Sequence, residues 1–212
     1  MGLGALEARS WIERSAAAVT LERDRLTELD SAIGDADHGA NMDRGFKAAL
    51  ERLEAGPEPA DAGAVLKSVA TTLMSKVGGA AGPLYGAFFL RMATPLAGTA
   101  DVAPAQWAEA FRAGVEGVRA RGKAELGDKT MIDALLPAAD ALDAAVGEGL
   151  PLGKAMERAR DAAEEGALAT VPLVARKGRA SYLGERSAGH QDPGATSSHL
   201  LLEAAAAAWR DN

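Results

Sequence analysis

The chain has 212 residues, 48% of them hydrophobic, no cysteine and a formal net charge of −7. Without cysteine there is no disulfide, thiolate zinc site or cysteine nucleophile, and the acidic balance argues against general binding to nucleic acid or an anionic membrane. Because the sequence has neither an apolar run of transmembrane length nor a secretory signal at its N-terminus, we expect a cytoplasmic protein.

Helix-forming residues dominate the sequence, and aromatic residues make up only 4% of it. Eight helices are expected, several with a proline at the start or a glycine just past the end. Their approximate ranges are 3–26, 38–53, 60–76, 83–98 and 104–122, then two that start near 130 and 151, and a last one over 195–210. Because most connections are short, we expect antiparallel neighbours in one all-α bundle or barrel domain over residues 1–212.

Three aspartates crowd the junction between the first two predicted helices. In LDSAIGDADHGANMDRGF, Asp30, Asp35 and Asp37 fall within eight residues, with Gly34 and Gly39 beside them. Such carboxylates repel one another unless a cation lies between them or one of them stays protonated. Carboxylate oxygens are hard ligands that suit Mg²⁺ or Ca²⁺. One interpretation of the cluster is therefore a divalent cation site.

Three other interpretations of the aspartate cluster are an EF-hand, a glycosidase carboxylate pair and solvated turn residues. An EF-hand is excluded, because a loop starting at Asp35 has Ala40 at the required glycine position and Phe46 at the required glutamate position. A glycosidase carboxylate pair is disfavoured by the short spacing and by the lack of an aromatic sugar platform. Solvated turn residues remain an open interpretation, since Asp37 stands where a helix N-cap is expected.

Glycine-rich turns precede later helices. SKVGGAAGPLYG, residues 75–86, places small residues before a helix start, where main-chain N–H groups can approach an anion, although close helix packing also explains it. GDKTM, residues 127–131, turns into the sixth predicted helix and either lines a pocket or caps that helix. GVRARGKA, residues 117–124, is not a P-loop, because Ala124 replaces the required Ser or Thr and no strand precedes it.

The connection over residues 176–194, RKGRASYLGERSAGHQDPG, has no clear periodicity and is long for a compact domain, which indicates a functional loop. Arg179 is its candidate phosphate-binding anchor, because a guanidinium pairs bidentately with phosphate. We interpret Arg176 and Arg186 as surface charges and His190 and His199 as structural or exposed residues. If these junctions converge at one end of the bundle, the aspartates hold Mg²⁺ and the metal bridges a nucleotide's phosphates.

Four stretches together resemble a known family: IGDADHGANMDRGF, VGGAAGPLYG, RGKAELGDKTM and RKGRASYLGERSAGHQDPGATS. In this order they are similar to the L subunit of bacterial dihydroxyacetone kinase, its nucleotide-binding component. The resemblance implies an eight-helix antiparallel up-and-down barrel with ADP or ATP at one end. It also implies two Mg²⁺ ions, held by Asp30, Asp35 and Asp37.

The resemblance carries further site residues over to this sequence. It implies nucleotide contacts at His38, Gly39, Ala40, Asn41, Ala80, Ala81, Gly122, Met131, Arg179, Asp192, Pro193 and Gly194, with Arg179 also in a catalytic role. The family usually has serine where this chain has Ala81, so one hydroxyl contact to phosphate is missing. No general base is required from this chain, because phosphoryl transfer depends mainly on positioning and charge neutralisation.

The resemblance also implies partners. The ketose dihydroxyacetone is bound by a separate K subunit, and in the phosphotransferase-dependent version a phosphohistidine protein, the M subunit, rephosphorylates retained ADP. In the ATP-dependent version the nucleotide exchanges as a substrate, and the acceptor is dihydroxyacetone or a related short ketose. A homodimer stays open. Two other hypotheses are a nucleotide-binding regulatory module without turnover of its own, and a purely structural helical domain.

Overall fold

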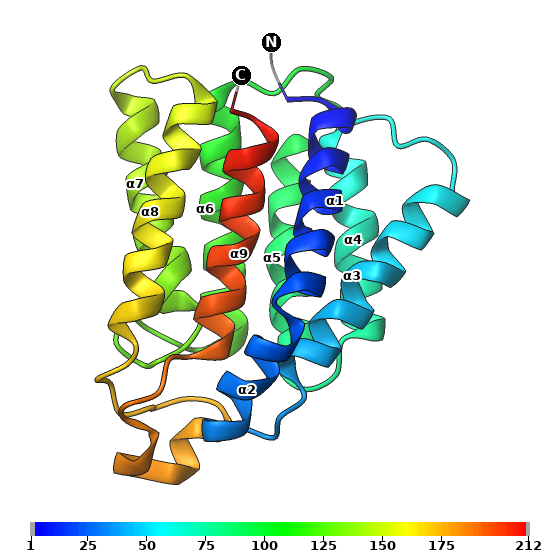
Figure 1. The fold of residues 1–212 in the computed structure, drawn as a ribbon. Coiled ribbons are helices and arrows are strands. Elements are labelled where there is room, and N and C mark those ends of the chain that lie inside the picture. The colour runs from blue at the N-terminus through cyan, green and yellow to red at the C-terminus, as the bar shows by residue number, and fades with distance from the viewer. Residues whose placement is uncertain (1–2, 211–212) are drawn as a thin grey trace.

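The computed structural model describes residues 3–210, which form nine α-helices and one 3₁₀ helix (Figure 1). In chain order these are α1 (Ala5–Leu21), α2 (Arg23–Ile33), α3 (His38–Ala55), α4 (Ala62–Lys76), α5 (Ala81–Leu96), α6 (Pro104–Gly122), α7 (Ile132–Gly147), α8 (Leu152–Ala169), η1 (Arg179–Ser187) and α9 (Pro193–Ala208). Within this part of the chain no strand forms, and Leu3 and Val102 make an isolated bridge. The predicted all-α class is confirmed.

The prediction of a single first helix over residues 3–26 is wrong. The chain bends at Glu22 (φ −92°, ψ 8°), which separates α1 from α2. The sequence of α2 is polar, and its buried residues are Leu26, Asp30 and Ile33, so it cannot extend the apolar face of α1. It instead lies below α1, beside the start of α3 (Figure 1). The eight predicted helices therefore become nine.

The connection over residues 176–194 contains a regular element that its sequence pattern did not indicate. This is η1, which follows Gly178 (φ 66°) and is kinked at Gly184 (φ 55°), two left-handed positions that glycine adopts without strain. It is attached through a small hydrophobic cluster separate from the main core: Ile33, Ala175, Ala180 and Leu183. The connection is thus partly regular, and the prediction that it is a functional loop stays a prediction.

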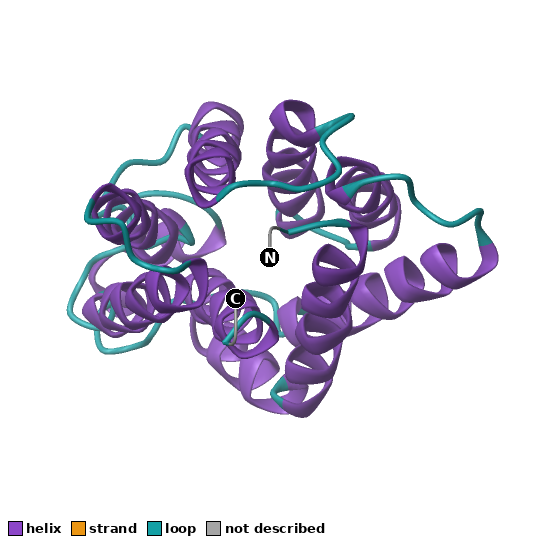
Figure 2. Cartoon of the chain, turned by 90° about the horizontal axis from the view of Figure 1, so that it is seen from above, coloured by secondary structure: helices purple, strands orange, loops and turns teal. Residues whose placement is uncertain are grey.

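The helices run up and down around one core. Each helix from α3 to α8 packs against the next α-helix in the chain, while α9 packs against α1 and α1 against α3. These contacts close a ring, which Figure 2 shows end on. This ring of helices favours the predicted antiparallel barrel, which stays a prediction. The alternation brings the N-termini of α3, α5, α7 and α9 to one end of the molecule (Figure 1).

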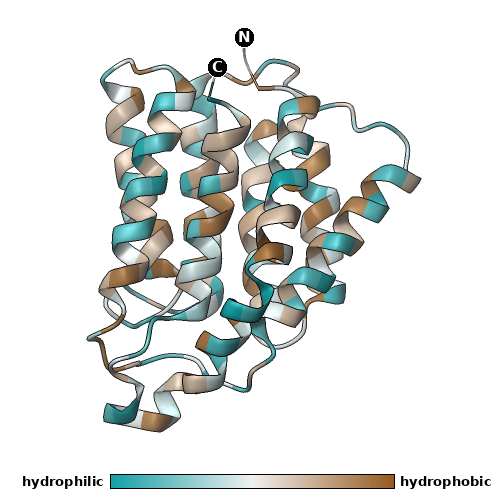
Figure 3. Ribbon diagram, in the orientation of Figure 1, coloured by the Kyte–Doolittle hydropathy of each residue, from teal (hydrophilic) through white to brown (hydrophobic). Residues whose placement is uncertain are grey.

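Aromatic side chains fill the core toward the opposite end. Trp11, Trp107 and Trp209 contact one another, with ring centroids 4.7 to 5.7 Å apart. The indole N–H of Trp11 donates to the carbonyl of Leu201 at 2.8 Å, which ties α1 to α9. Figure 3 shows hydrophilic and hydrophobic residues on different faces of the helices, as amphipathic packing requires. Within residues 3–210, no helix combines the length and apolar character needed to span a membrane.

Candidate functional site

A cleft opens at the end of the molecule where four helices begin. It encloses about 850 Å³ of empty space, part of it open to solvent. The first residues or N-caps of α3, α5, α7 and α9 all contribute to its wall. The positive dipole ends of these four helices therefore face a common space, which favours an anionic ligand.

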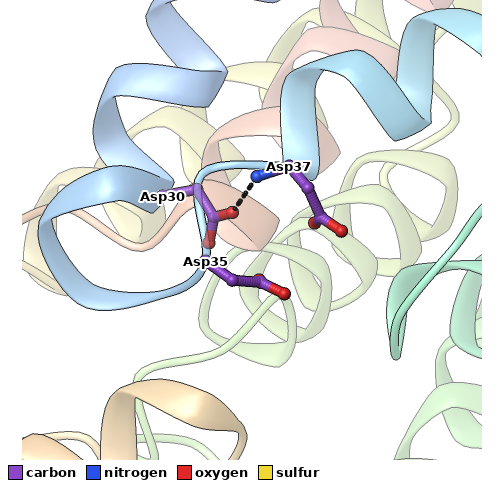
Figure 4. Close-up of side chains that lie close together, drawn as sticks. All are labelled: Asp30, Asp35 and Asp37. Atoms are coloured by element: carbon purple, nitrogen blue, oxygen red, sulfur yellow. Dashed lines mark hydrogen bonds between the residues drawn. The ribbon is translucent and has the colours of Figure 1, made fainter.

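The three aspartates stand on one side of this cleft. One carboxylate oxygen from each of Asp30, Asp35 and Asp37 lies within 4.8 Å of the others (Figure 4). Asp30, at the end of α2, is buried, and its Oδ2 accepts the N–H groups of Asp37 at 2.9 Å and His38 at 3.1 Å. Asp30 thus fixes the start of α3 and holds the other two carboxylates near its own.

The loop between Asp30 and Asp37 is shaped to keep these carboxylates together. A Cβ at Gly34 would lie 2.0 Å from Oδ1 of Asp30, so a larger residue there would displace that carboxylate. Asp37 occupies the N-cap position of α3, as predicted, but its side chain makes no capping hydrogen bond. The predicted N-cap position is therefore confirmed, while the carboxylate of Asp37 is left available.

A positive charge reaches the cluster from η1. The guanidinium of Arg179 pairs with the carboxylate of Asp35 at 3.0 Å, and its side chain is largely exposed. A single exposed guanidinium offsets little of the repulsion among three carboxylates. Hard oxygen donors from three side chains, one of them rigidly held, fit a divalent cation such as Mg²⁺, which needs few protein ligands and keeps its remaining positions for water or phosphate.

A buried polar network supports the floor of the cleft. Nε2 of His38 lies 2.8 Å from Oγ of Ser197, which lies 2.7 Å from the hydroxyl of Tyr85. The Tyr85 hydroxyl also contacts Oγ of Ser198 at 3.0 Å. Burial raises the pKa of Tyr85 to about 12 and lowers the pKa of His38, so both side chains are neutral at pH 7. The network joins α3, α5 and α9 without placing a charge beneath the cleft.

Asp192 is the N-cap of α9, and its Oδ2 accepts the N–H of Ala195 at 2.7 Å. Burial raises the pKa of Asp192 to about 7, and the nearby carboxylate of Asp133 adds to this effect. The ammonium of Lys129 and the N–H groups of α9 oppose the shift without cancelling it. The folded protein therefore holds a proton on Asp192 well above the pH at which the unfolded chain releases it.

This pKa predicts a pH dependence of stability. Between pH 4 and 7 the folded state binds a proton that the unfolded state has lost, so the free energy of unfolding falls as the pH rises. The contribution of Asp192 is at most about 1.4 kcal/mol per pH unit. We expect urea unfolding of an Asp192→Asn variant, which keeps a capping oxygen, to lose this term. A difference in unfolding free energy between the two proteins that stays constant from pH 4 to 7 would contradict the expectation. Both proteins contain His38, so the contribution of its titration cancels in that difference.

The structure brings most of the predicted site residues together. The cleft is lined by Asp30, Asp35, Asp37, His38, Asn41, Ala80, Ala81, Met131, Arg179, Asp192, Pro193 and Gly194. Gly122 lies in an adjoining pocket, which shares Ala80 and Met131 with the cleft. Gly39 and Ala40 are not in the wall. Gly39 instead faces α2, since a Cβ there would lie 2.0 Å from the carbonyl oxygen of Arg23.

Several lining residues were not singled out from the sequence. Gly78 and Gly79 precede α5, Lys129 and Thr130 precede α7, and Lys177 precedes η1. The glycine pair and GDKTM were recognised as turns, but the pattern did not reveal which of their residues face a ligand. Lys129 is the clearest omission, because a lysine in a turn ordinarily points to solvent, whereas this one is 1% exposed.

Comparisons with known proteins indicate a family. A model of the DAK2 domain matches residues 32–207. The chain is 44% identical, over its full length and that of the relative, to the PEP-dependent dihydroxyacetone kinase ADP-binding subunit DhaL of Escherichia coli K12. It is 42% identical to the PTS-dependent dihydroxyacetone kinase ADP-binding subunit DhaL of Lactococcus lactis, covering 91% of this chain and 92% of that protein.

More distant relatives are larger proteins. The rat triokinase/FMN cyclase is 38% identical, over 85% of this chain and 31% of its own length. The crystal structure of the dihydroxyacetone kinase of C. freundii with AMP-PNP and Mg²⁺ superposes with a TM-score of 0.71 at 25% identity, covering 94% of this chain and 33% of that one. In these proteins the region similar to this chain is one part of a longer polypeptide.

Proposed function

The chain belongs to the DAK2 domain family, and from that premise we propose that it is the ADP-binding subunit of a phosphotransferase-dependent dihydroxyacetone kinase. The observation that carries the proposal is the cleft, where three carboxylates and four helix N-termini face one space. Two relatives that match at 42% identity or more over nearly their whole length are named ADP-binding subunits of a PEP-dependent and of a PTS-dependent dihydroxyacetone kinase. An acidic protein can bind a polyanion in this way, because the metal and helix ends supply the positive charge.

The residues divide the work of phosphoryl transfer among them. Asp30, Asp35 and Asp37 would hold magnesium, proposed as two ions, which when bound neutralises charge on the nucleotide's phosphates. The positive dipole ends of α5 and α9 would favour the phosphates, and Arg179 on η1 would add a positive charge beside Asp35. These interactions act by positioning and by stabilising charge, which is what this class of reaction requires of a protein.

Activity of this chain depends on partners. We propose that the ketose acceptor is held by another subunit, as the family resemblance implies. We assign dihydroxyacetone to a K subunit and the rephosphorylation of retained ADP to a phosphohistidine-carrying M subunit. A homodimer of this chain remains a prediction.

A second candidate is an ATP-dependent kinase subunit for a related short ketose. The similarity to triokinase/FMN cyclases favours it, since those relatives also share most of this chain. The two candidates differ in what happens to the nucleotide. A retained cofactor stays in the cleft after transfer, whereas a substrate leaves it. A regulatory module without turnover would bind nucleotide but give no transfer when the K subunit is present.

The test is to denature freshly purified protein and identify released nucleotide by chromatography and metal by elemental analysis. We expect ADP and magnesium in near-stoichiometric amounts, because a retained cofactor survives purification. Empty protein that binds ATP reversibly on titration would instead support the ATP-dependent candidate. Failure to bind either nucleotide in the presence of magnesium would refute both.

A further inference from the structure

Lys129 stands in the wall of the cleft, at the junction of three segments. It lies in the turn before α7 and is 1% exposed. Its ammonium donates to the main-chain carbonyls of Thr170 at 2.7 Å and Val171 at 3.4 Å, and also to that of His190. Thr170 ends α8, and His190 precedes the N-cap of α9. One side chain therefore links the start of α7, the end of α8 and the approach to α9.

The partners of this ammonium are neutral, which makes its burial costly. A buried charge must be compensated by hydrogen bonds, and here main-chain carbonyls provide them. Burial lowers the pKa of Lys129, while the carboxylates of Asp192 and Asp133 act in the opposite direction. The backbone of Lys129 is also left-handed (φ 62°), a conformation that disfavours side chains other than glycine. The fold thus keeps a lysine at this position despite two unfavourable terms, the burial of its ammonium and its left-handed backbone.

The linked segments form two of the helix starts at the cleft. Thr130 and Met131 follow Lys129 directly and line the cleft, as do Asp192 to Gly194 on α9. The two starts touch, since a Cβ at Gly194 would lie 3.5 Å from Cβ of Met131. Thr170 strengthens the same junction, because its hydroxyl accepts the N–H of Asp192 at 2.9 Å.

We propose that Lys129 is a positioning residue for the nucleotide: by holding three carbonyls at one ammonium, it sets the starts of α7 and α9 at the spacing that the phosphates require. The inference rests on the proposed nucleotide-binding function. Lys129 spends its N–H donors on main-chain carbonyls, and it acts through the groups that the starts of α7 and α9 present to the cleft. Small displacements of such groups are costly, because charge-assisted contacts to phosphate depend on distance and direction.

The test compares two variants that both lose stability. Lys129→Met removes the ammonium but keeps a long side chain, and Leu142→Ala creates a cavity in the buried middle of α7, away from the cleft. ADP affinity is measured by calorimetry with magnesium, at a temperature where circular dichroism shows both variants folded. We expect Lys129→Met to bind ADP at least tenfold more weakly than wild type and Leu142→Ala to change the affinity by less than twofold.

Amide hydrogen exchange gives a second measurement. A general loss of stability would speed exchange throughout the helices and not at the two helix starts in particular. In Lys129→Met, faster exchange is expected at the amides of Met131 to Ala134 and of Gly194 to Thr196, relative to the middle of both helices. If Lys129→Met does not fold, Lys129→Gln replaces it, since its amide retains two N–H donors, and a threefold or larger loss of ADP affinity is expected. Wild-type affinity in the folded variant would overturn the positioning role. Wild-type protein that binds no nucleotide would instead overturn the proposed function.

Discussion

Replacing Asp35 with alanine is expected to abolish magnesium-dependent binding of ADP while leaving the helical fold intact. Asp35 lies in the loop between α2 and α3, and its carboxylate pairs with Arg179 of η1 but accepts no main-chain hydrogen bond that shapes the loop. Its removal takes away one of the three carboxylates proposed to hold magnesium, without leaving a buried donor unpaired. We expect a loss of ADP affinity of about 100-fold or more in calorimetry with magnesium.

The matched control is Asp101→Ala. Asp101 is an exposed aspartate in the connection between α5 and α6, at the end opposite the cleft, so this variant changes the net charge by the same amount. It should bind ADP as wild type does, and both variants should show wild-type helical circular dichroism. An Asp35→Ala protein with unchanged ADP affinity would remove the metal assignment, whereas equal losses in both variants would indicate a long-range charge effect.

Substitution of Gly39 by alanine is expected to destabilise the protein and to weaken ADP binding together. A Cβ at Gly39 would lie 2.0 Å from the carbonyl oxygen of Arg23 and 2.5 Å from Oγ1 of Thr27, so α3 must move away from α2. In the wild-type protein the carboxylate of Asp30 accepts hydrogen bonds from the N–H groups of Asp37 and His38. Movement of α3 would lengthen or break these hydrogen bonds. We expect a loss of about 2 kcal/mol or more in the free energy of unfolding, measured by urea denaturation.

Gly147→Ala serves as the control, because a Cβ there would have no neighbour within 4 Å and the position lies at the far end of α7. Alanine in a helix is favoured over glycine, so this variant should be as stable as wild type or slightly more stable. If Gly39→Ala kept full stability but lost ADP affinity, Gly39 would contact the nucleotide directly, as the family resemblance implies. Full stability with full affinity would contradict both roles.

The sequence predicted the helices well where periodicity and breakers agree. Pro104 begins α6 as expected, and the start of α3 is at His38. The break at Glu22 was not predictable, because Glu22 and its neighbours are good helix formers and the bend depends on which face of α2 can be buried. Likewise η1 is short and is held by a few contacts, such as that of Ile33 with Ala180, which join residues far apart in the chain.

In the site, too, features formed by residues close in the sequence were predictable, whereas features formed by residues far apart in the chain were not. The aspartate cluster is local, so its spacing alone suggested a cation site beside the alternative of solvated turn residues. The grouping of Met131 with Asp192 required the family resemblance, since they are distant in sequence and meet through helix packing. Gly39 resembles a ligand-contacting glycine in sequence, but its closest neighbours lie on α2. The burial of Lys129 depends on carbonyls of Thr170 and His190, which no local pattern identifies.

The tryptophan cluster described in the core has a practical consequence for spectroscopy. All three tryptophans of the chain belong to it, in contact with one another on α1, on α6 and just after α9, while the aromatic side chain that lines the cleft is Tyr85. Tryptophan fluorescence, excited at the red edge of the absorption band, therefore reports whether the helical bundle is folded. Its intensity in the folded protein changes little when a ligand binds in the cleft. A melting curve followed in this way measures global unfolding, so a bound ligand shows as a shift of the midpoint. A direct binding signal requires a label introduced near the cleft.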